Sequence, residues 1–251
     1  MNALQQQLPQ FLDYLNAQKL SAVLDLSFFS SDIAEGLYFQ SSIPTGYGLG
    51  SSGALCAAIY DRYALDKTTN LVDLKALFGI LESYFHGKSS GLDPLVCYVN
   101  QPLLVATTTN IQQVKIPTDK EGKYTLFLLD THIPRQTAPF VNGFLERCEN
   151  PIYDKICSEQ LVPKVDEAIA SLLNNDWNSL YQAFFRISMF QFNYFDFMIP
   201  ATFKEVWKMG LLSDHFKLKI CGAGGGGYLL GISRDFPRTK KMLESFDVLR
   251  F

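Results

Sequence analysis

Pro44-Thr45-Gly46-Tyr47-Gly48-Leu49-Gly50-Ser51-Ser52-Gly53 is the stretch of this sequence that decides the fold. Its glycines let backbone N–H groups turn towards a ligand without a clash from Cβ atoms. Residues 51–65 follow with helical spacing, so the run ends at a helix N-terminus, where unpaired amides and the helix dipole attract anions. Ser51 and Ser52 could donate to phosphate oxygens, or one of them could ligate magnesium. The stretch therefore predicts a phosphate cradle formed by Gly46, Gly48, Gly50, Ser51 and Ser52.

Other interpretations of this stretch are weaker. A serine N-cap on an ordinary helix needs no glycines ahead of it. Gly48-x-Gly50-x-x-Gly53 matches the dinucleotide fingerprint in letters. That fingerprint also needs an acidic residue closing a second strand about 20 residues later, and Asp73 falls in a predicted helix instead. The sequence has no G-x-x-x-x-G-K-[ST] run, which excludes a P-loop NTPase.

A second candidate site reads Glu-Ser-Tyr-Phe-His-Gly-Lys-Ser-Ser-Gly-Leu-Asp-Pro over residues 82–94. Glu82 and His86 are four positions apart in a predicted helix and so share one face. Magnesium-dependent phosphoryl transfer needs a carboxylate on the metal and often a second one that accepts the substrate proton. Glu82 and Asp93 suit these roles. Two alternatives stay open: Asp93 before Pro94 could be a helix N-cap, and Glu82 could lie on a solvated helix face.

Two further sites lie in the second half of the chain. Residues 219–228 run from a predicted strand into Gly222-Ala223-Gly224 and three more glycines, which permits close backbone approach by a ligand or another segment. A flexible turn would not need so many glycines. Residues 130–137 (Asp-Thr-His-Ile-Pro-Arg-Gln-Thr) follow another predicted strand, and Arg135 there could pair with a phosphate or a carboxylate.

Composition excludes several classes of protein. The net charge of -3 gives no sign of binding to nucleic acid or to an anionic membrane. The aromatic stretch 184–199 contains Arg186 and Asp196, so it predicts a core helix rather than a membrane span. The N-terminal residues lack the pattern of a signal peptide, and the five cysteines are scattered without a zinc-type spacing. We therefore expect a soluble cytoplasmic protein without a zinc site.

Hydrophobic spacing predicts a mixture of helices and strands without strict alternation, which indicates an α+β fold. The expected helices cover 3–20, 51–65, 71–85, 163–174, 177–190, 201–210 and 237–246. The expected strands cover 22–29, 37–43, 102–108, 124–130, 216–221 and 227–233. The polar stretch near residue 120 predicts a domain boundary, which gives domains 1–120 and 121–251.

Taken together and in this order, the four sites resemble the GHMP kinases, a family of small-molecule kinases. The family's second motif, P-x-x-x-G-L-G-S-S-A, matches residues 44–53 except that Gly53 replaces alanine. Its third motif, K-[IL]-x-G-A-G-G-G-G, matches residues 219–227. Two further patterns are similar to the mevalonate kinases of this family. E-x-x-x-H-G-x-x-S-G-x-D matches residues 82–93, and V-P-R-x-T matches residues 133–137 with isoleucine in first place.

The resemblance implies a two-domain GHMP kinase fold with the active site in the cleft between the domains. It implies ATP and Mg²⁺ as cofactors and a small alcohol as substrate, with mevalonate as the first candidate. Ser52 and Glu82 would hold magnesium, and Asp93 would be the catalytic base. The resemblance places further residues on the substrate side: His86, Arg135, Thr137, Gly222, Ala223 and Gly224.

One difference from the family concerns the first residues. Family members open with a lysine-bearing strand and a first motif, whereas this sequence opens with a polar helix. An unpaired neighbouring strand would then favour self-association, so a homodimer is one expectation, as is weak catalysis. Two alternatives stay open. The acceptor could be another GHMP substrate (phosphomevalonate, a sugar or homoserine), or the protein could bind nucleotide without catalysis.

Overall fold

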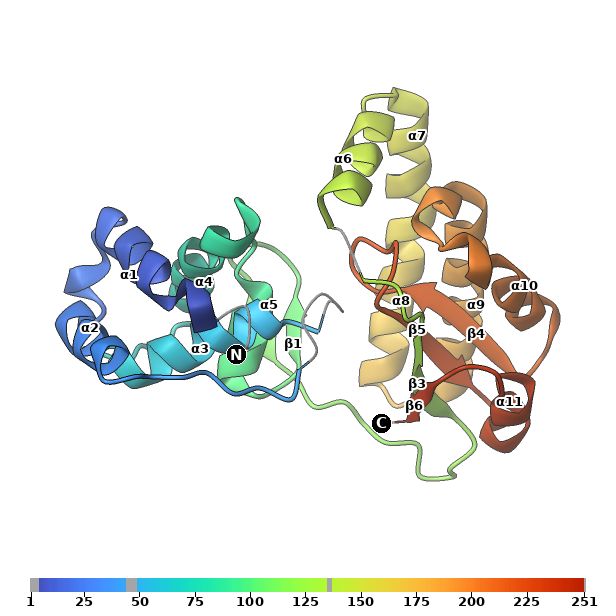
Figure 1. Cartoon of the computed structure of the whole chain (residues 1–251). Helices are drawn as coiled ribbons and strands as arrows, with labels where there is room; N and C mark the ends of the chain where they lie inside the picture. The colour runs from blue at the N-terminus through green and yellow to red at the C-terminus, as the bar shows by residue number, and fades with distance from the viewer. Residues whose placement is uncertain (1–4, 44–48, 135–136, 251) are drawn as a thin grey trace. The chain divides into compact units, whose positions relative to one another are not determined.

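The computed structural model describes residues 5–43, 49–134 and 137–250, and these form two compact units (Figure 1). Unit 1 contains the described residues up to Lys115, and unit 2 contains those from Ile116 onwards. Each unit combines its own helices with its own sheet, as expected for an α+β protein. Each is described by itself below.

Unit 1 is mainly helical. A short 3-10 turn, Gln5–Gln7, precedes α1, and a second one, Leu20–Ala22, follows it. The helices are α1 (Leu8–Ala17), α2 (Leu26–Ala34), α3 (Ser51–Tyr63), α4 (Leu71–His86) and α5 (Leu92–Val99). Strands β1 (Leu103–Val105) and β2 (Ile111–Gln113) form an antiparallel pair in which Leu104 lies opposite Gln112.

The core of unit 1 is built from apolar residues at helical spacing. Phe11 of α1, Tyr60 of α3 and Phe78 of α4 are each at most 1% exposed. The rings of Tyr60 and Phe78 meet edge to face with centroids 5.3 Å apart, a favourable arrangement for aromatic pairs. Because α3 and α4 share this core, the start of α3 is held against the end of α4.

Two strands expected in unit 1 are absent from the described residues 20–43, so that part of the prediction is wrong. Residues 22–29 read as an apolar strand, but the Asp25 side chain accepts a hydrogen bond from the Phe28 N–H and starts helix α2. Leu26 and Phe29 are then buried three positions apart, which is helical spacing. Residues 37–43 contain no helix or strand.

Unit 2 is built on a four-stranded antiparallel sheet. Its strands are β3 (Thr125–Asp130), β4 (Phe216–Ile220), β5 (Tyr228–Ser233) and β6 (Val248–Arg250), in the order β4-β5-β3-β6. Asp130 lies opposite Tyr228, and Ile220 lies opposite Leu229. The segments that follow β3 and β4 therefore leave the sheet at the same end.

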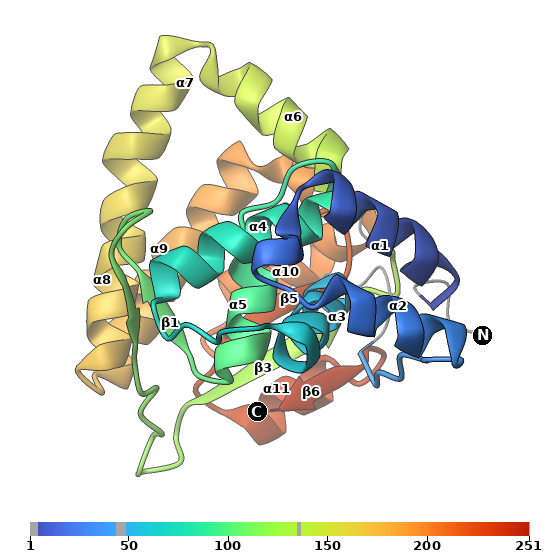
Figure 2. The same ribbon diagram turned by 90° about the vertical axis from the view of Figure 1, so that its left-hand side faces the viewer.

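Helices complete unit 2, and most of them lie against the sheet (Figures 1 and 2). They are α6 (Thr137–Cys148), α7 (Pro151–Ile156), a π-helical stretch (Cys157–Leu161), α8 (Val162–Leu173), α9 (Trp177–Tyr194), α10 (Lys204–Leu212) and α11 (Phe236–Met242). Two 3-10 turns, Asp196–Met198 and Ala201–Phe203, join α9 to α10. Both views show α6 and α7 standing away from the sheet.

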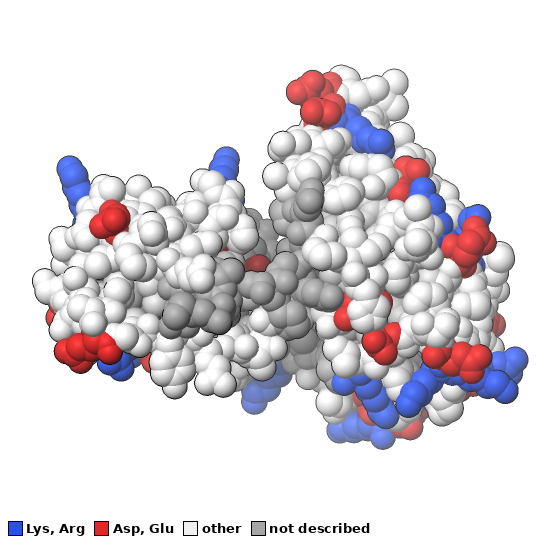
Figure 3. All heavy atoms as spheres, in the orientation of Figure 1, with Lys and Arg blue, Asp and Glu red and all other residues white. Residues whose placement is uncertain are grey.

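The aromatic stretch 184–199 falls largely in α9, as the sequence predicts for a core helix. Phe184, Ile187 and Phe190 are each at most 5% exposed, and α9 packs on strand β4. Among the described residues, no helix is long and apolar enough to cross a membrane. On the face drawn in Figure 3, basic and acidic side chains are interspersed rather than gathered by sign.

The other expected helices are confirmed, with ends shifted by a few residues, and so are the strands expected over 102–108, 124–130, 216–221 and 227–233. Elements that the sequence did not predict are α2, α5, α6, α7, β2 and β6.

Candidate active site

Ser52 lies in the first turn of α3, and its side chain is turned towards α4. Gly50 precedes the helix with a left-handed φ of 75°, and no side chain caps this helix start. The alternative of an ordinary serine N-cap is therefore wrong. Ser52 is 8% exposed, and its Oγ donates to Glu82 Oε1 at 3.2 Å. Its Oγ also lies 2.9 Å from His86 Nε2. Because the single hydroxyl proton goes to Glu82, we assign the proton on Nε2 as the donor to Ser52.

Glu82 is a buried carboxylate, not a residue of a solvated helix face. It is 4% exposed, and it accepts hydrogen bonds from Ser52 and from Ser89. Burial raises the pKa of Glu82, and the nearby charge of Asp93 raises it further. Hydrogen bonds from Ser89 and Ser52 and the charge of His86 act in the opposite direction. A buried carboxylate whose charge is only partly balanced is a suitable ligand for a cation.

Asp93 lies in the first turn of α5, but it is not the N-cap. Gly91 occupies that place with a φ of 72°, so the capping alternative for Asp93 is wrong. The Asp93 side chain is exposed and lies beside the end of the glycine run. A Cβ added to Gly50 would stand 3.4 Å from Asp93 Cβ and 3.8 Å from Oδ2. The Asp93 carboxylate is therefore next to the backbone that leads into α3.

Gly53 explains why α5 can come so close to α3. A Cβ at this position would stand 2.7 Å from the Pro94 nitrogen and 2.8 Å from the Asp93 carbonyl carbon. Those are backbone atoms, which cannot turn aside as a side chain can. The single departure from the family's second motif, glycine for alanine, thus has a local structural reason.

The residues of this cluster suit a magnesium ion. A buried carboxylate oxygen and a serine hydroxyl converge, and within the described residues neither Glu82 nor Asp93 makes an ion pair with a lysine or arginine. The described residues hold no group of three or more histidine, cysteine or acidic side chains that could bind a metal alone. Magnesium is usually bound through one or two carboxylates together with substrate phosphates, so it does not need such a group.

The glycine-rich loop of unit 2 connects β4 to β5, and most of it is embedded in its own unit. Gly225 N–H donates to the Met198 carbonyl at 2.7 Å, and Gly227 N–H donates to the Ile133 carbonyl at 2.8 Å. A Cβ at Gly224 would stand 2.6 Å from the Met198 oxygen. The loop is therefore glycine-rich partly for internal packing. At its tip Gly222 is exposed, and Ala223 is half-buried.

The segment after β3 lies against this loop. Thr131 donates to the Gly227 carbonyl through its N–H at 3.0 Å and through its hydroxyl at 2.7 Å. The structure thus brings the third and fourth candidate sites together within unit 2. Arg135 lies outside the described residues, as do Gly46 and Gly48 of the first site. Thr137 begins α6, and only its backbone is described.

One residue that sequence reasoning missed is Ser89, which donates to Glu82. It is not specified by any family pattern, and a serine in a polar loop is an ordinary residue. The available signal was its position in a short loop that must return over the helix bearing Glu82.

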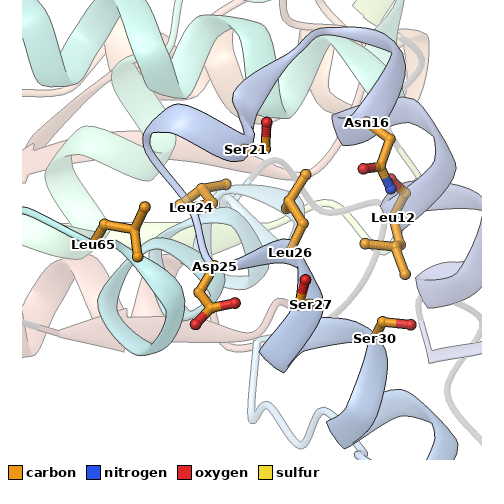
Figure 4. A pocket seen from close by; sticks show the side chains of 9 residues that line it. All are labelled: Leu12, Asn16, Ser21, Leu24, Asp25, Leu26, Ser27, Ser30 and Leu65. Carbon is orange, nitrogen blue, oxygen red and sulfur yellow. The ribbon is translucent and has the colours of Figure 1, made fainter.

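A pocket elsewhere in unit 1 contains none of the predicted site residues (Figure 4). Its volume is about 610 Å³, and it is lined by Leu12, Asn16, Ser21, Leu24, Asp25, Leu26, Ser27, Ser30 and Leu65. Its one charged side chain, Asp25, already caps α2. The pocket therefore offers no cation and no further group suited to phosphoryl transfer.

The chain is similar to known proteins in sequence and in fold. Residues 17–101 match the model of the GHMP kinases N terminal domain. Among solved structures, the chain is similar to mevalonate kinase from L. major in complex with R-mevalonate, with a TM-score of 0.63 and 17% identity. The resemblance to the GHMP kinases is confirmed. No curated protein shows a significant match to the chain.

Two further kinases of known structure have a similar fold. Phosphomevalonate kinase from Streptococcus pneumoniae, in complex with phosphomevalonate and AMPPNP, gives a TM-score of 0.58 at 17% identity. Mevalonate kinase from methicillin-resistant Staphylococcus aureus gives 0.52 at 20% identity. Each match covers 82% of this chain, and the chain spans 66% of the L. major enzyme, 69% of the pneumococcal enzyme and 65% of the staphylococcal enzyme. At these identities the likeness establishes the fold, and the neighbours include kinases with different acceptors.

Proposed function

We propose that this protein is an ATP-dependent kinase that phosphorylates a small alcohol, with mevalonate as the first candidate acceptor. The observation that supports it most is the contact of Ser52 with buried Glu82, beside Asp93, at the start of a helix that follows a glycine run. This arrangement offers backbone amides for phosphate, oxygen ligands for magnesium and a carboxylate that could accept a proton.

Each group has a distinct task in this proposal. The amides of the α3 N-terminus bind phosphate oxygens of ATP, with Ser51 beside them. Ser52 and Glu82 would hold Mg²⁺, which would neutralise the phosphate charge. Asp93 takes the proton of the acceptor hydroxyl as that oxygen attacks the γ-phosphorus, and the bond between the γ-phosphorus and the β–γ bridging oxygen breaks to release ADP.

The substrate side is assigned by resemblance. Arg135 and Thr137 would contact the acceptor, together with the loop tip at Gly222 and Ala223. The resemblance assigns Gly224 to the same side, but Gly224 is buried against Met198. His86 is also assigned to the substrate side, and its contact with Ser52 places it beside the proposed metal ligands. A second candidate acceptor is phosphomevalonate, because a phosphomevalonate kinase is among the structures of the same fold.

The test is a product assay with the full chain. We expect phosphorylated mevalonate by ³¹P NMR when ATP, Mg²⁺ and R-mevalonate are supplied, and ADP release in equal amount. Parallel reactions with phosphomevalonate, homoserine and galactose compare kcat/KM between acceptors. Nucleotide binding by calorimetry, with no phosphorylated product from any acceptor, would refute catalysis and favour the non-catalytic alternative.

A further inference from the structure

The loop between α4 and α5 returns over α4 and brings Ser89 onto Glu82. Ser89 is half-buried, and its hydroxyl donates to Glu82 Oε2. The other carboxylate oxygen, Oε1, accepts from Ser52. The two oxygens of Glu82 therefore have different partners, one in the loop and one at the proposed metal site.

Ser89 is itself held in one orientation. The Gly91 N–H donates to Ser89 Oγ at 3.0 Å, so the hydroxyl accepts from the backbone and its own proton is left for Glu82. The Ser89 N–H donates to Ser83 Oγ at 3.2 Å, and Ser83 in turn donates to the Gly79 carbonyl at 2.6 Å. The loop is thus fixed at two points around the residue that contacts Glu82.

The loop can follow this path because residue 91 is a glycine. Gly91 has a φ of 72°, and a Cβ there would stand 2.1 Å from the Lys75 carbonyl oxygen and 2.5 Å from the Gly79 nitrogen. The loop backbone therefore lies directly on the backbone of α4. Any larger residue at position 91 would lift the loop, and Ser89 with it, away from Glu82.

We propose that Ser89 is a positioning residue that fixes Glu82 Oε2 and so presents Oε1, beside Ser52, to the divalent cation. The proposal rests on the proposed function. A carboxylate on a long side chain turns easily about its last torsion, which has a broad preference. With Oε2 held by Ser89, the carboxylate keeps one orientation, and Oε1 stays where Ser52 can share the ion. Partners of metal ligands in other proteins typically contribute about 10–100-fold in metal affinity or activity.

The experiment measures metal binding directly, with Mn²⁺ as the probe and electron paramagnetic resonance to count free Mn²⁺ in the presence of AMPPNP. We expect Ser89→Ala to weaken Mn²⁺ binding by about 10–100-fold. The matched control is Ser31→Ala, because Ser31 also donates to a glutamate, Glu35 at 3.4 Å, but on α2. That control should leave Mn²⁺ binding unchanged.

A kinetic measurement separates positioning from general damage. In Ser89→Ala, excess Mg²⁺ should restore kcat, because the ligands remain and only their orientation is loosened. If Ser89→Ala does not fold, Ser89→Cys preserves nearly the same volume with a weaker donor, and weaker Mn²⁺ binding is expected there too.

The outcomes distinguish this inference from the proposed function. Wild-type Mn²⁺ affinity in Ser89→Ala, alongside a large loss in Glu82→Gln, would overturn the role of Ser89 and leave the metal site intact. Wild-type affinity in Glu82→Gln would overturn the metal site itself, and the inference with it.

Discussion

Gly53 of α3 and Pro94 of α5 approach so closely that a Cβ on the glycine would stand 2.7 Å from the proline nitrogen. This contact fixes Asp93, the residue before Pro94, beside the start of α3. The distance between the proposed base and the proposed phosphate cradle thus depends on the absence of one methyl group.

Gly53→Ala should therefore destabilise unit 1, although alanine is the better helix former and is the residue of the family motif. We expect a loss of about 1–3 kcal/mol, as for other overpacked sites, measured by urea unfolding. Gly143→Ala is the matched control, because it also lies within a helix and its new Cβ would meet only Phe197 at 3.6 Å. Equal stability of Gly53→Ala and wild type would show that the two helices can separate at no cost.

Asp93→Asn should lower kcat by about 10²–10⁴-fold while Mg·ATP binding survives, because an amide cannot accept the acceptor proton. The fold should tolerate the change, since Gly91 rather than Asp93 precedes α5. Asp73→Asn is the control, because Asp73 also lies in the first turn of a helix, α4. A wild-type kcat in Asp93→Asn, measured by coupled ADP release, would remove Asp93 from the role of base.

Glu82→Gln should make the metal-free protein more heat-stable at pH 7. Burial raises the pKa of Glu82, so between its ordinary pKa and the raised value the folded chain binds a proton more tightly than the unfolded chain. The stability that this group contributes is present at acid pH and is lost as the pH rises through that window. Each kcal/mol gained corresponds to about 4–8 °C in Tm for a unit of roughly 100 residues.

The pH dependence supplies the check on that prediction. The Tm difference between Glu82→Gln and wild type should shrink as the pH falls towards 4, where the wild-type carboxyl is protonated. A constant difference from pH 4 to pH 8 would contradict the pKa direction. The same variant should need more Mg²⁺ for activity.

Lys217 should make the stability of unit 2 depend on pH in the alkaline range. Burial lowers its pKa to about 8 from an ordinary 10.5, while the charge of Asp214 acts in the opposite direction. Between those two values the unfolded chain binds the proton and the folded chain does not, so the stability of unit 2 rises with pH. Lys217→Met abolishes this titration. Scanning calorimetry should therefore show the Tm of wild type gaining on that of the variant between pH 8 and pH 10.

Gly224→Ala should destabilise unit 2 more than Gly122→Ala does. Both glycines have positive φ, 71° and 67°, so the backbone strain of the two changes is alike. The new Cβ meets the Met198 carbonyl oxygen at 2.6 Å in the first case and nothing within 4 Å in the second. The difference in urea midpoint between the two variants therefore measures the steric cost of a Cβ in the packed loop. Equal losses would mean that the glycine-rich loop needs glycine only for its φ values.

The closeness of the candidate site residues was more predictable from the sequence than the fold around them. Ser52, Glu82 and Asp93 belong to patterns with fixed spacing, and a helix face plus a short loop brings such residues together. The α2 region was predicted wrongly because AVLDLSFF has the apolar character of a strand, and one capping aspartate, Asp25, reverses the outcome. Gly53 could not be interpreted beforehand, because its importance comes from a contact with another element, the backbone of α5.

Strand β6 can join the sheet of unit 2 only at the end of its synthesis, because it is the last element in the described chain. It pairs with β3. Next to this pairing, a hydrogen bond between the side chains of His132 and Asp247 joins residues 115 positions apart. Strand pairings over such separations are slow to form, because a long loop must close before any contact is gained. Unit 1 instead consists mainly of helices close in sequence. During synthesis the helices that carry Ser52 and Glu82 should therefore fold early, while the sheet of unit 2 stays incomplete until β6 has left the ribosome.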